Sequence, residues 1–440
     1  MDSMMAGILR KRRTGTAGSR ATSVLAQKRA SVLVAALAAE EDGPRRILHR
    51  VANVQRERMD WPARVASLTT NEFIARYRVD LQGFEELCEK IRPMLKRMTG
   101  TSVAAELKLS CALRFLCGAQ KVDVADLHGL GESTAIKYLW ATLACIDAVE
   151  ELPLMKYLDE LEADGESPGL RAISSKYDNR TGGVMTGCIG ALDGLAIKVY
   201  RPRENPSHYY CRKGFYSFNM QGICDSDHKF TWCSILTAGA TNDGIAISVS
   251  SLNQVLSDPE HALASKHYWL SGDDAYKGIA HDTNSLCTPF SGNKVTERED
   301  NWNYYQSSGR MTIECSFGEL VGRWGILQRK LHCSIEHATM LVRVLCKLHN
   351  ICVDRRLPRI APSGTHPGDG NDPYDNADES PIFTHDITGR SLDADARPNR
   401  RARRGTQPRR EDMADAIKAA GMERPLHSEF TYRRPADSAE

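Results

Sequence analysis

Hydrophobic residues recur at helical spacing in the first half of the chain. In residues 71–98 the apolar side chains stand three or four positions apart and predict an amphipathic helix, namely Phe84, Leu87, Ile91 and Leu95. A second helical segment is predicted over 107–118. We therefore expect a helical region over residues 61–150.

Residues 122–142 have the pattern of a helix-turn-helix. A short helix, a turn at Gly129 to Gly131 and a second helix capped by Ser133 fit this segment. Such a unit would place Thr134, Lys137 and Tyr138 against DNA. Helical hairpins with glycine turns are also common packing units, so both interpretations stay open.

The pattern changes to short apolar strands from about residue 184. Strand-like segments are VMTGCIGALDG, YSFNMQGICDSD, KFTWCSILTAGA, KHYWLSGDD and the short LCTPF, with a predicted helix in IAISVSSLNQVL. Residues 291–309 are polar and predict a loop. They precede a helix with an apolar stripe, Ile313, Phe317, Leu320, Trp324 and Leu327, and a final helix ends near Arg356. Residues 180–356 therefore predict a mixed α/β domain.

Charge is distributed unevenly at the two ends. The chain has 440 residues, of which 41% are hydrophobic, and a formal net charge of +2, so it can bury an ordinary core. Residues 3–39 nevertheless contain seven Lys or Arg and no acid, and 397–410 contain seven Arg. We expect a disordered basic segment over 1–60 and a mostly disordered tail over 357–440 with a short helix in MADAIKAAGM.

The basic cluster from Arg10 to Arg13 has three interpretations. It fits a nuclear import signal, a phosphate-contacting arm or a mitochondrial presequence. Thirteen cysteines without CxxC spacing predict reduced intracellular thiols and no structural zinc. The longest early apolar stretch, 32–39, is far shorter than the roughly 20 residues of a membrane span, so we expect no membrane segment and no signal peptide.

Three acidic residues stand in contexts that suit a metal site. Asp193 follows the apolar run CIGAL, Asp273 follows the strand-like HYWLSG, and Glu314 lies on the amphipathic helix. Strand ends can bring distant carboxylates together, and Mg²⁺ or Mn²⁺ prefers oxygen ligands. Two such ions about 4 Å apart can promote phosphodiester cleavage.

Each acid also has an ordinary structural interpretation. Asp193 could begin a turn with Gly194, Asp274 competes with Asp273 as a ligand, and Glu314 could pair with Arg310 one turn earlier on the helix. A phosphatase DxD motif is excluded because Ala191 and Leu195 occupy the positions of the second acid. No GxxxxGK[ST] phosphate loop is present.

Several motifs in order resemble one protein family. GALDG, NPSHYYCRKGFYSFNMQGICD, GDDAY, RMTIECSFGELVGRW and LCKLHNICVD follow the pattern of the PIF/Harbinger transposases, and the match runs from about Asn71 to Arg356. The chain thus resembles a Harbinger-type transposase-derived nuclease. This resemblance implies a ribonuclease-H-like fold in which Asp193, Asp273 and Glu314 form a DDE triad.

The resemblance also implies DNA-binding positions. Tyr210, Arg212 and Lys213 would offer a ring and cations to DNA, although an ordinary β-hairpin with solvated charges remains the alternative. Arg310 and Arg323 supply further cations on the last motif. Ser307 and Val321 depart from the Tyr and Lys that related transposases carry.

One further acid has a weaker assignment. Where the family often has His before Asp, this chain has Asn242 before Asp243. We therefore expect Asp243 only to support the metal ligands.

The leading hypothesis is a metal-dependent DNA endonuclease or transposase that uses two divalent ions, Mg²⁺ or Mn²⁺. The alternative is a domesticated, non-catalytic DNA-binding adaptor that keeps the fold. The resemblance suggests a Myb-like partner protein, and joining two DNA ends would favour a homodimer. A nuclear location is expected, or a cytoplasmic one with partner-dependent import.

Overall fold

The computed structural model describes residues 56–164, 167–257, 268–280, 285–292, 295–360 and 407–424. The chain divides into two compact units, the first reaching residue 151 and the second comprising 116–118 and the residues from 152 onward. The basic cluster at Arg10 to Arg13 lies outside the described residues. Of the helices that the structure describes, none has the length and apolar character needed to cross a membrane.

The first unit is helical, as expected. Its elements are α3 (Trp61–Ala66), α4 (Thr70–Tyr77), α5 (Leu81–Thr99), α6 (Ala105–Leu116), α7 (Lys121–Leu127) and α8 (Glu132–Val149). The predicted apolar stripe on α5 is buried. Trp61 of α3 stacks on Phe84 of α5 with the ring centroids 4.7 Å apart, so the stripe anchors the short first helix.

The turn between α7 and α8 confirms two helices joined by glycines but not the predicted cap. Helix α8 begins at Glu132, so Ser133 lies inside its first turn and Gly131 is the N-cap residue. Glycine has no side chain, so α8 lacks a side-chain cap at this position. His128 instead fixes the turn, since its buried ring contacts Ser110 Oγ and Val124 O at 2.8 Å each. Gly129 has a φ of 59°, and a Cβ there would lie 1.9 Å from Glu57 O, so only glycine fits.

The second unit is built on a mixed sheet. Its strands are β1 (Cys188–Lys198), β2 (Ser217–Cys224), β3 (Phe230–Ala238), β4 (Trp269–Ser271) and β5 (Leu286–Cys287). The strand order is β3-β2-β1-β4-β5. β1, β2 and β3 pair antiparallel, whereas β1, β4 and β5 pair parallel. The predicted mixed α/β domain is confirmed, including the short strand in LCTPF.

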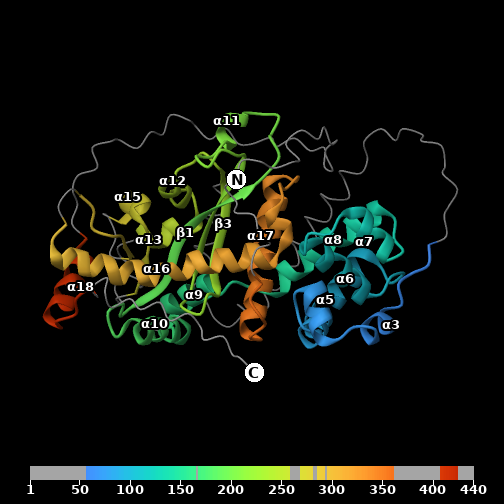
Figure 1. Ribbon diagram of the computed structural model, residues 1–440, viewed down its shortest axis with the longest axis horizontal. Helices are drawn as coiled ribbons and strands as arrows, with labels where there is room; N and C mark the ends of the chain where they lie inside the picture. The colour runs from blue at the N-terminus through green and yellow to red at the C-terminus, as the bar shows by residue number, and fades with distance from the viewer. Residues whose placement is uncertain are drawn as a thin grey trace, which may run out of the picture. The chain divides into compact units, whose positions relative to one another are not determined.

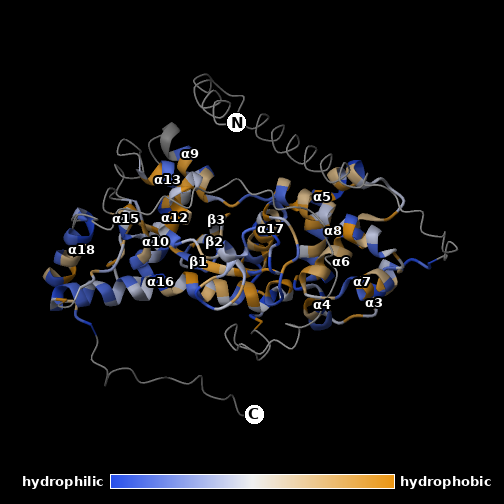
Figure 2. Ribbon diagram, turned by 90° about the horizontal axis from the view of Figure 1, so that it is seen from above, coloured by the Kyte–Doolittle hydropathy of each residue, from blue (hydrophilic) through white to orange (hydrophobic). Residues whose placement is uncertain are grey.

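Helices cover both sides of this sheet. The described helices of this unit are α9 (Leu154–Asp164), α10 (Pro168–Thr181), α11 (Pro206–Tyr209), α12 (Asp243–Ser248), α13 (Ser251–Ser257), α15 (Lys277–Ala280), α16 (Glu297–Arg323), α17 (Ile335–Asp354) and α18 (Pro408–Ala419). The long α16 crosses the strands in Figure 1. Figure 2 shows α16 on one side of the strands and α9 and α13 on the other. The helix predicted in IAISVSSLNQVL is divided into α12 and α13.

The loop predicted over 291–309 is wrong for most of its length, because α16 already begins at Glu297. Thr296 and Glu299 form a reciprocal capping box that starts the helix. Its polar sequence conceals a buried face that includes Trp302 and Gln306. Gln306 Nε2 donates to Ser271 Oγ at 3.0 Å and to Gly272 O at 2.8 Å. These two hydrogen bonds to the end of β4 satisfy the Gln306 amide, so this polar side chain can occupy a buried position on the helix.

The C-terminal helix expected in MADAIKAAGM is confirmed as α18. Its Ala414 and Ile417 belong to the same buried cluster as Trp302 and β5. Arg298 of α16 pairs with Glu411 and Asp415 of α18 at 2.6 Å each. Residues 407–424 are therefore part of the folded unit, whereas 361–406 and 425–440 of the predicted tail lie outside the described residues.

Replacing Trp302 by Ala should lower the free energy of unfolding by about 3–5 kcal/mol, since a fully buried aromatic ring leaves a cavity. Urea denaturation followed by circular dichroism measures this loss. Met311→Ala, on the same helix but 53% exposed, should change stability by no more than about 0.5 kcal/mol. Equal effects of the two substitutions would contradict the buried position of Trp302.

Candidate active site

Asp193 lies within β1 and not at its end. It pairs with Gly222 of β2, and the antiparallel ladder continues to Lys198, so the alternative of a turn at Gly194 is wrong. The parallel ladder with β4 is shorter, because its last pair is Ala191 with Ser271. Asp193 therefore stands just beyond the point where β1 stops pairing with β4.

Asp273 begins the short 3₁₀ turn that follows β4. Its Oδ1 accepts a hydrogen bond from Ala275 N at 2.9 Å, and its charge interacts with those of Arg310 and Asp243. Asp274 is exposed and pairs with Lys277. The two neighbouring acids thus have different surroundings, and Asp273 is the one that joins the cluster.

Arg310 connects the first and third acids. Its Nη1 lies 2.7 Å from Glu314 Oε1 and 3.3 Å from Asp193 Oδ2. The helical ion pair considered as the ordinary interpretation of Glu314 is therefore present. The same guanidinium also reaches β1, so the pair and the acidic cluster occur together, and Glu314 remains half-exposed.

Asp243 has a more central place than the sequence suggested. Its Oδ1 accepts hydrogen bonds from Asn219 Nδ2 and Gln221 Nε2 at 2.9 Å each, and its charge acts on both Asp193 and Asp273. The buried Tyr276 hydroxyl donates to Gln221 Oε1 at 2.6 Å. This bond orients the Gln221 amide so that its nitrogen faces the carboxylate.

Asn219, Gln221 and Tyr276 were not predicted from the sequence. A usable signal existed, since Asn219 and Gln221 alternate on β2 and so point to one face of the sheet. Both are polar in a strand that is buried along its whole length. Buried polar side chains require partners, and the partner that both amides share here is the Asp243 carboxylate.

Gly194 allows the cluster to close. A Cβ at this position would lie 2.4 Å from Asp243 Oδ1 and 2.9 Å from Gln221 Nε2. Since no larger residue fits without displacing the network, the Asp-Gly sequence in GALDGLAI reflects close approach of Asp243 to the β1 backbone.

The acids are crowded, and the pKa of Asp193 is raised to about 6 as a result. Burial is the main cause and the charges of Asp273 and Asp243 add to it, while the Gly194 amide and Arg310 oppose the shift. Burial is also the main cause that raises the pKa of Asp273. Four carboxylates, Asp193, Asp243, Asp273 and Glu314, face one guanidinium, which leaves three negative charges uncompensated.

This charge imbalance fits divalent cations. Carboxylate oxygens are the ligands that Mg²⁺ and Mn²⁺ prefer, and a cation would relieve the cost of keeping Asp193 ionised. Among the described side chains, no three His, Cys, Asp and Glu groups are already arranged to hold one ion. Arg310 lies between two of the acids instead, so metal binding would require its guanidinium to move.

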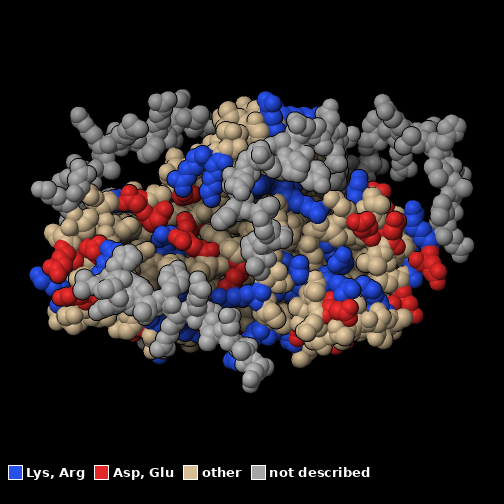
Figure 3. All heavy atoms as spheres, viewed as in Figure 1, with Lys and Arg blue, Asp and Glu red and all other residues tan. Residues whose placement is uncertain are grey.

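The predicted DNA-contacting residues differ in their solvent exposure. Tyr210, Arg212 and Lys213 are exposed after α11, and Lys137 is exposed on α8. Thr134 is half-buried. Figure 3 shows acidic side chains gathered over the region of β1 and α15, with Lys and Arg atoms beside them.

Two of the predicted DNA contacts do not fit the structure. Tyr138 is buried, with Lys108 Nζ 5.2 Å from its ring centre. Arg323 is only 4% exposed and donates to Pro358 O at 2.8 Å. Each side chain is taken up by intramolecular packing and cannot reach a phosphate.

Comparison with known proteins agrees with this geometry. The family model described as DDE superfamily endonuclease matches residues 192–350. Relatives named "Putative nuclease HARBI1" are 22% identical in Bos taurus and 22% in Homo sapiens over 289 residues, and 24% in Rattus norvegicus over 293 residues. Each alignment covers 63% of this chain and 78% of the relative. No solved structure gives a significant match.

The three acids of the cluster, and Asp243 with them, fall inside the matched segment. Residues 192–350 therefore belong to the DDE superfamily endonuclease family, and the chain is homologous to HARBI1.

Proposed function

We propose that the protein is a metal-dependent endonuclease that cleaves DNA phosphodiester bonds. The observation that carries this proposal is the half-buried Asp193 beside Asp273 and Asp243, with Glu314 facing it across Arg310. Such concentrated negative charge is costly in a folded protein unless a cation compensates it. The match to an endonuclease family supplies the reaction class.

The side chains have distinct parts in this proposal. Asp193 on β1 and Asp273 just after β4 would hold the cations, and Glu314 would complete the site from α16. Asp243 is held in place by hydrogen bonds from the Asn219 and Gln221 amides. When bound, divalent ions would lower the pKa of the attacking water and stabilise the negative charge that develops on the leaving oxygen.

Arg310 has a positioning role before cations arrive. Its guanidinium restrains Glu314 and reduces repulsion between that carboxylate and Asp193. Once released, it is free to contact a DNA phosphate. The exposed Tyr210, Arg212 and Lys213 support DNA binding in the same unit, because cations bind phosphates and an exposed ring can stack on a base.

Two finer assignments belong to the same proposal. The mixed sheet with helices on both sides supports a ribonuclease-H-like fold. The pair α7 and α8 supports a helix-turn-helix, with Lys137 as its exposed cation. A non-catalytic DNA-binding adaptor would keep both features but would not cleave.

Asp193→Asn, Asp273→Asn and Glu314→Gln should each abolish metal-dependent nicking of supercoiled plasmid DNA, with a loss of at least about a hundredfold. Each substitution removes a charged ligand that the cations need. Gel electrophoresis with Mg²⁺ or Mn²⁺ measures the cleavage. Asp274→Asn is the matched control, because it removes a neighbouring exposed charge and should retain activity.

The outcomes separate the two hypotheses. Cleavage that survives in the triad variants, or disappears equally in Asp274→Asn, would contradict the assigned site. DNA binding without cleavage by the wild-type protein in either metal would favour the adaptor.

Asp193→Asn should also stabilise the protein by up to about 3 kcal/mol at pH 7.5 without divalent ions. The pKa of Asp193 rises from 3.8 to about 6 on folding, and each pKa unit corresponds to about 1.4 kcal/mol. The folded state therefore binds the proton more tightly, so stability falls as pH rises from about 4 to 6. Thermal unfolding in EDTA measures the difference.

The stabilisation should shrink to about half at pH 5, where wild-type Asp193 is largely protonated in the folded state. Asp274→Asn should give no such gain. A less stable Asp193→Asn protein at pH 7.5 would show that Arg310 and the Gly194 amide compensate the buried charge.

A further inference from the structure

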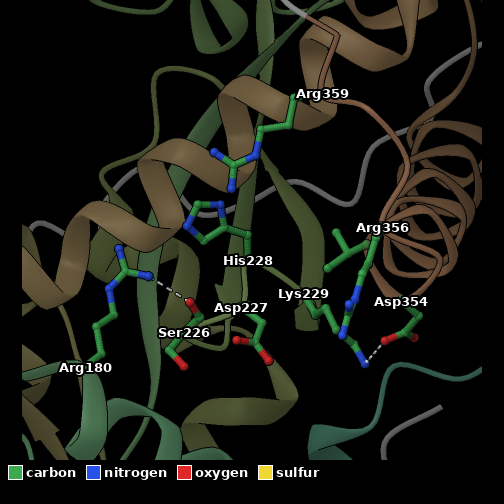
Figure 4. A pocket seen from close by; sticks show the side chains of 9 residues that line it. Arg180, Ser226, Asp227, His228, Lys229, Asp354, Arg356 and Arg359 are labelled. Carbon is green, nitrogen blue, oxygen red and sulfur yellow. Dashed lines mark hydrogen bonds and ion pairs between the residues drawn. The ribbon is translucent and has the colours of Figure 1, made fainter. Parts of the chain in front are cut away.

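A second polar pocket lies apart from the acidic cluster. Its volume is about 540 Å³, and three chain segments line it (Figure 4). These are the end of α10 with Arg180, the β2–β3 turn from Ser226 to Lys229, and the end of α17 with the residues up to Arg359. The proposed nuclease mechanism uses none of these residues.

Positive charge is in excess at this pocket. Lys176 pairs with Asp227, Lys229 with Asp354 at 2.8 Å, and Arg359 with Glu319 at 3.0 Å. These pairs include both acids that line the pocket, Asp227 and Asp354. The buried Asp225 behind the turn instead accepts hydrogen bonds from the backbone N–H groups of Asp227 and Lys229. Arg180 donates to the carbonyl of Ser226 at 2.9 Å, a neutral partner that leaves its charge intact.

Arg356 adds a second uncompensated charge. Within the described part of the chain, neither Arg180 nor Arg356 pairs with an acidic side chain. Arg356 is exposed and lines the pocket. Two guanidinium groups of this kind in one pocket favour an anion, and guanidinium suits phosphate because it offers parallel N–H donors.

Two of the four described non-glycine residues with a positive φ line this pocket. His228 has a φ of 69° and Arg356 a φ of 54°, a left-handed conformation that costs non-glycine residues energy. Asn350 anchors the neighbouring Phe230, since its side chain bonds both Phe230 N and Phe230 O at 2.8 and 2.7 Å. His349 Nε2 contacts the His228 carbonyl at 3.0 Å. The turn is therefore held firmly against α17.

The pocket is distinct from the nuclease site. Glu319, which contacts both His228 and Arg359, lies five residues after Glu314 on α16. Five residues turn an α-helix by about 140° beyond a full turn, so the two glutamates leave different flanks of the helix. A phosphate bound at this pocket is not the one being cleaved.

We infer that this pocket binds a phosphate group, with Arg356 and Arg180 as its principal ligands and His228 beside them. The phosphate belongs either to the backbone of bound nucleic acid or to a small phosphorylated molecule. The volume exceeds that of a single phosphate, so a chain of phosphates fits.

Isothermal titration calorimetry of the full chain with inorganic tripolyphosphate tests this inference, in EDTA so that metal binding and cleavage play no part. Arg356→Gln should weaken binding at least about tenfold, the loss expected for one charge-assisted contact. Arg356→Lys should recover part of it. Arg424→Gln is the matched control, since it removes an equal charge beside Asp300 at the other end of α16 and should bind like wild type.

A short duplex DNA in the same buffer distinguishes the two sources. Weaker duplex binding by Arg356→Gln with a shallower salt dependence identifies nucleic acid. Unchanged duplex binding with lost tripolyphosphate binding identifies a small phosphorylated ligand.

No tripolyphosphate binding by wild type, or equal losses in Arg356→Gln and Arg424→Gln, would overturn the inference. Should Arg356→Gln fail to fold, Arg180→Gln provides the same measurement, because it removes the other principal ligand of the pocket.

Discussion

Repulsion among crowded carboxylates is the constraint on which the second unit depends. Asp193, Asp243 and Asp273 come from separate parts of the sequence, and their charges act on one another inside a partly dehydrated region. Hydrogen bonds and ion pairs stabilise these carboxylates in the folded protein. Amides hold Asp243, backbone N–H groups bind Asp193 and Asp273, and one arginine bridges to Glu314.

These contacts explain several features that have no other evident purpose. Gly194 leaves space for the Asp243 carboxylate, and Tyr276 orients the amide that binds it. Gln306 hydrogen-bonds α16 to the end of β4. This contact fixes the position of Arg310 and Glu314, further along the same helix, relative to the sheet. The site is thus supported by residues several positions away from the acids themselves.

Much of this organisation was predictable from the sequence, and the failures have physical causes. Apolar runs identified the strands. The order of the motifs predicted three acids, of which the structure links Asp193 and Glu314 through Arg310. The start of α16 was missed because its buried face is partly polar, with Gln306 satisfied by β4. The alternation of Asn219 and Gln221 shows that they share a face of β2, but their partners Asp243 and Tyr276 are distant in the sequence and could not be read from it. Tyr138 and Arg323 were assigned to DNA because residue type alone does not reveal burial.

The packing of α18 has a consequence for where the nuclease unit ends. The family match stops at residue 350, yet Ala414 and Ile417 fill part of the core beside β5 and α16. A protein shortened to the family boundary would expose apolar surface next to Trp302 and lose the partners of Arg298. The smallest autonomous form of this unit therefore has to include a segment that lies more than fifty residues beyond its recognisable sequence, roughly the length of a small domain.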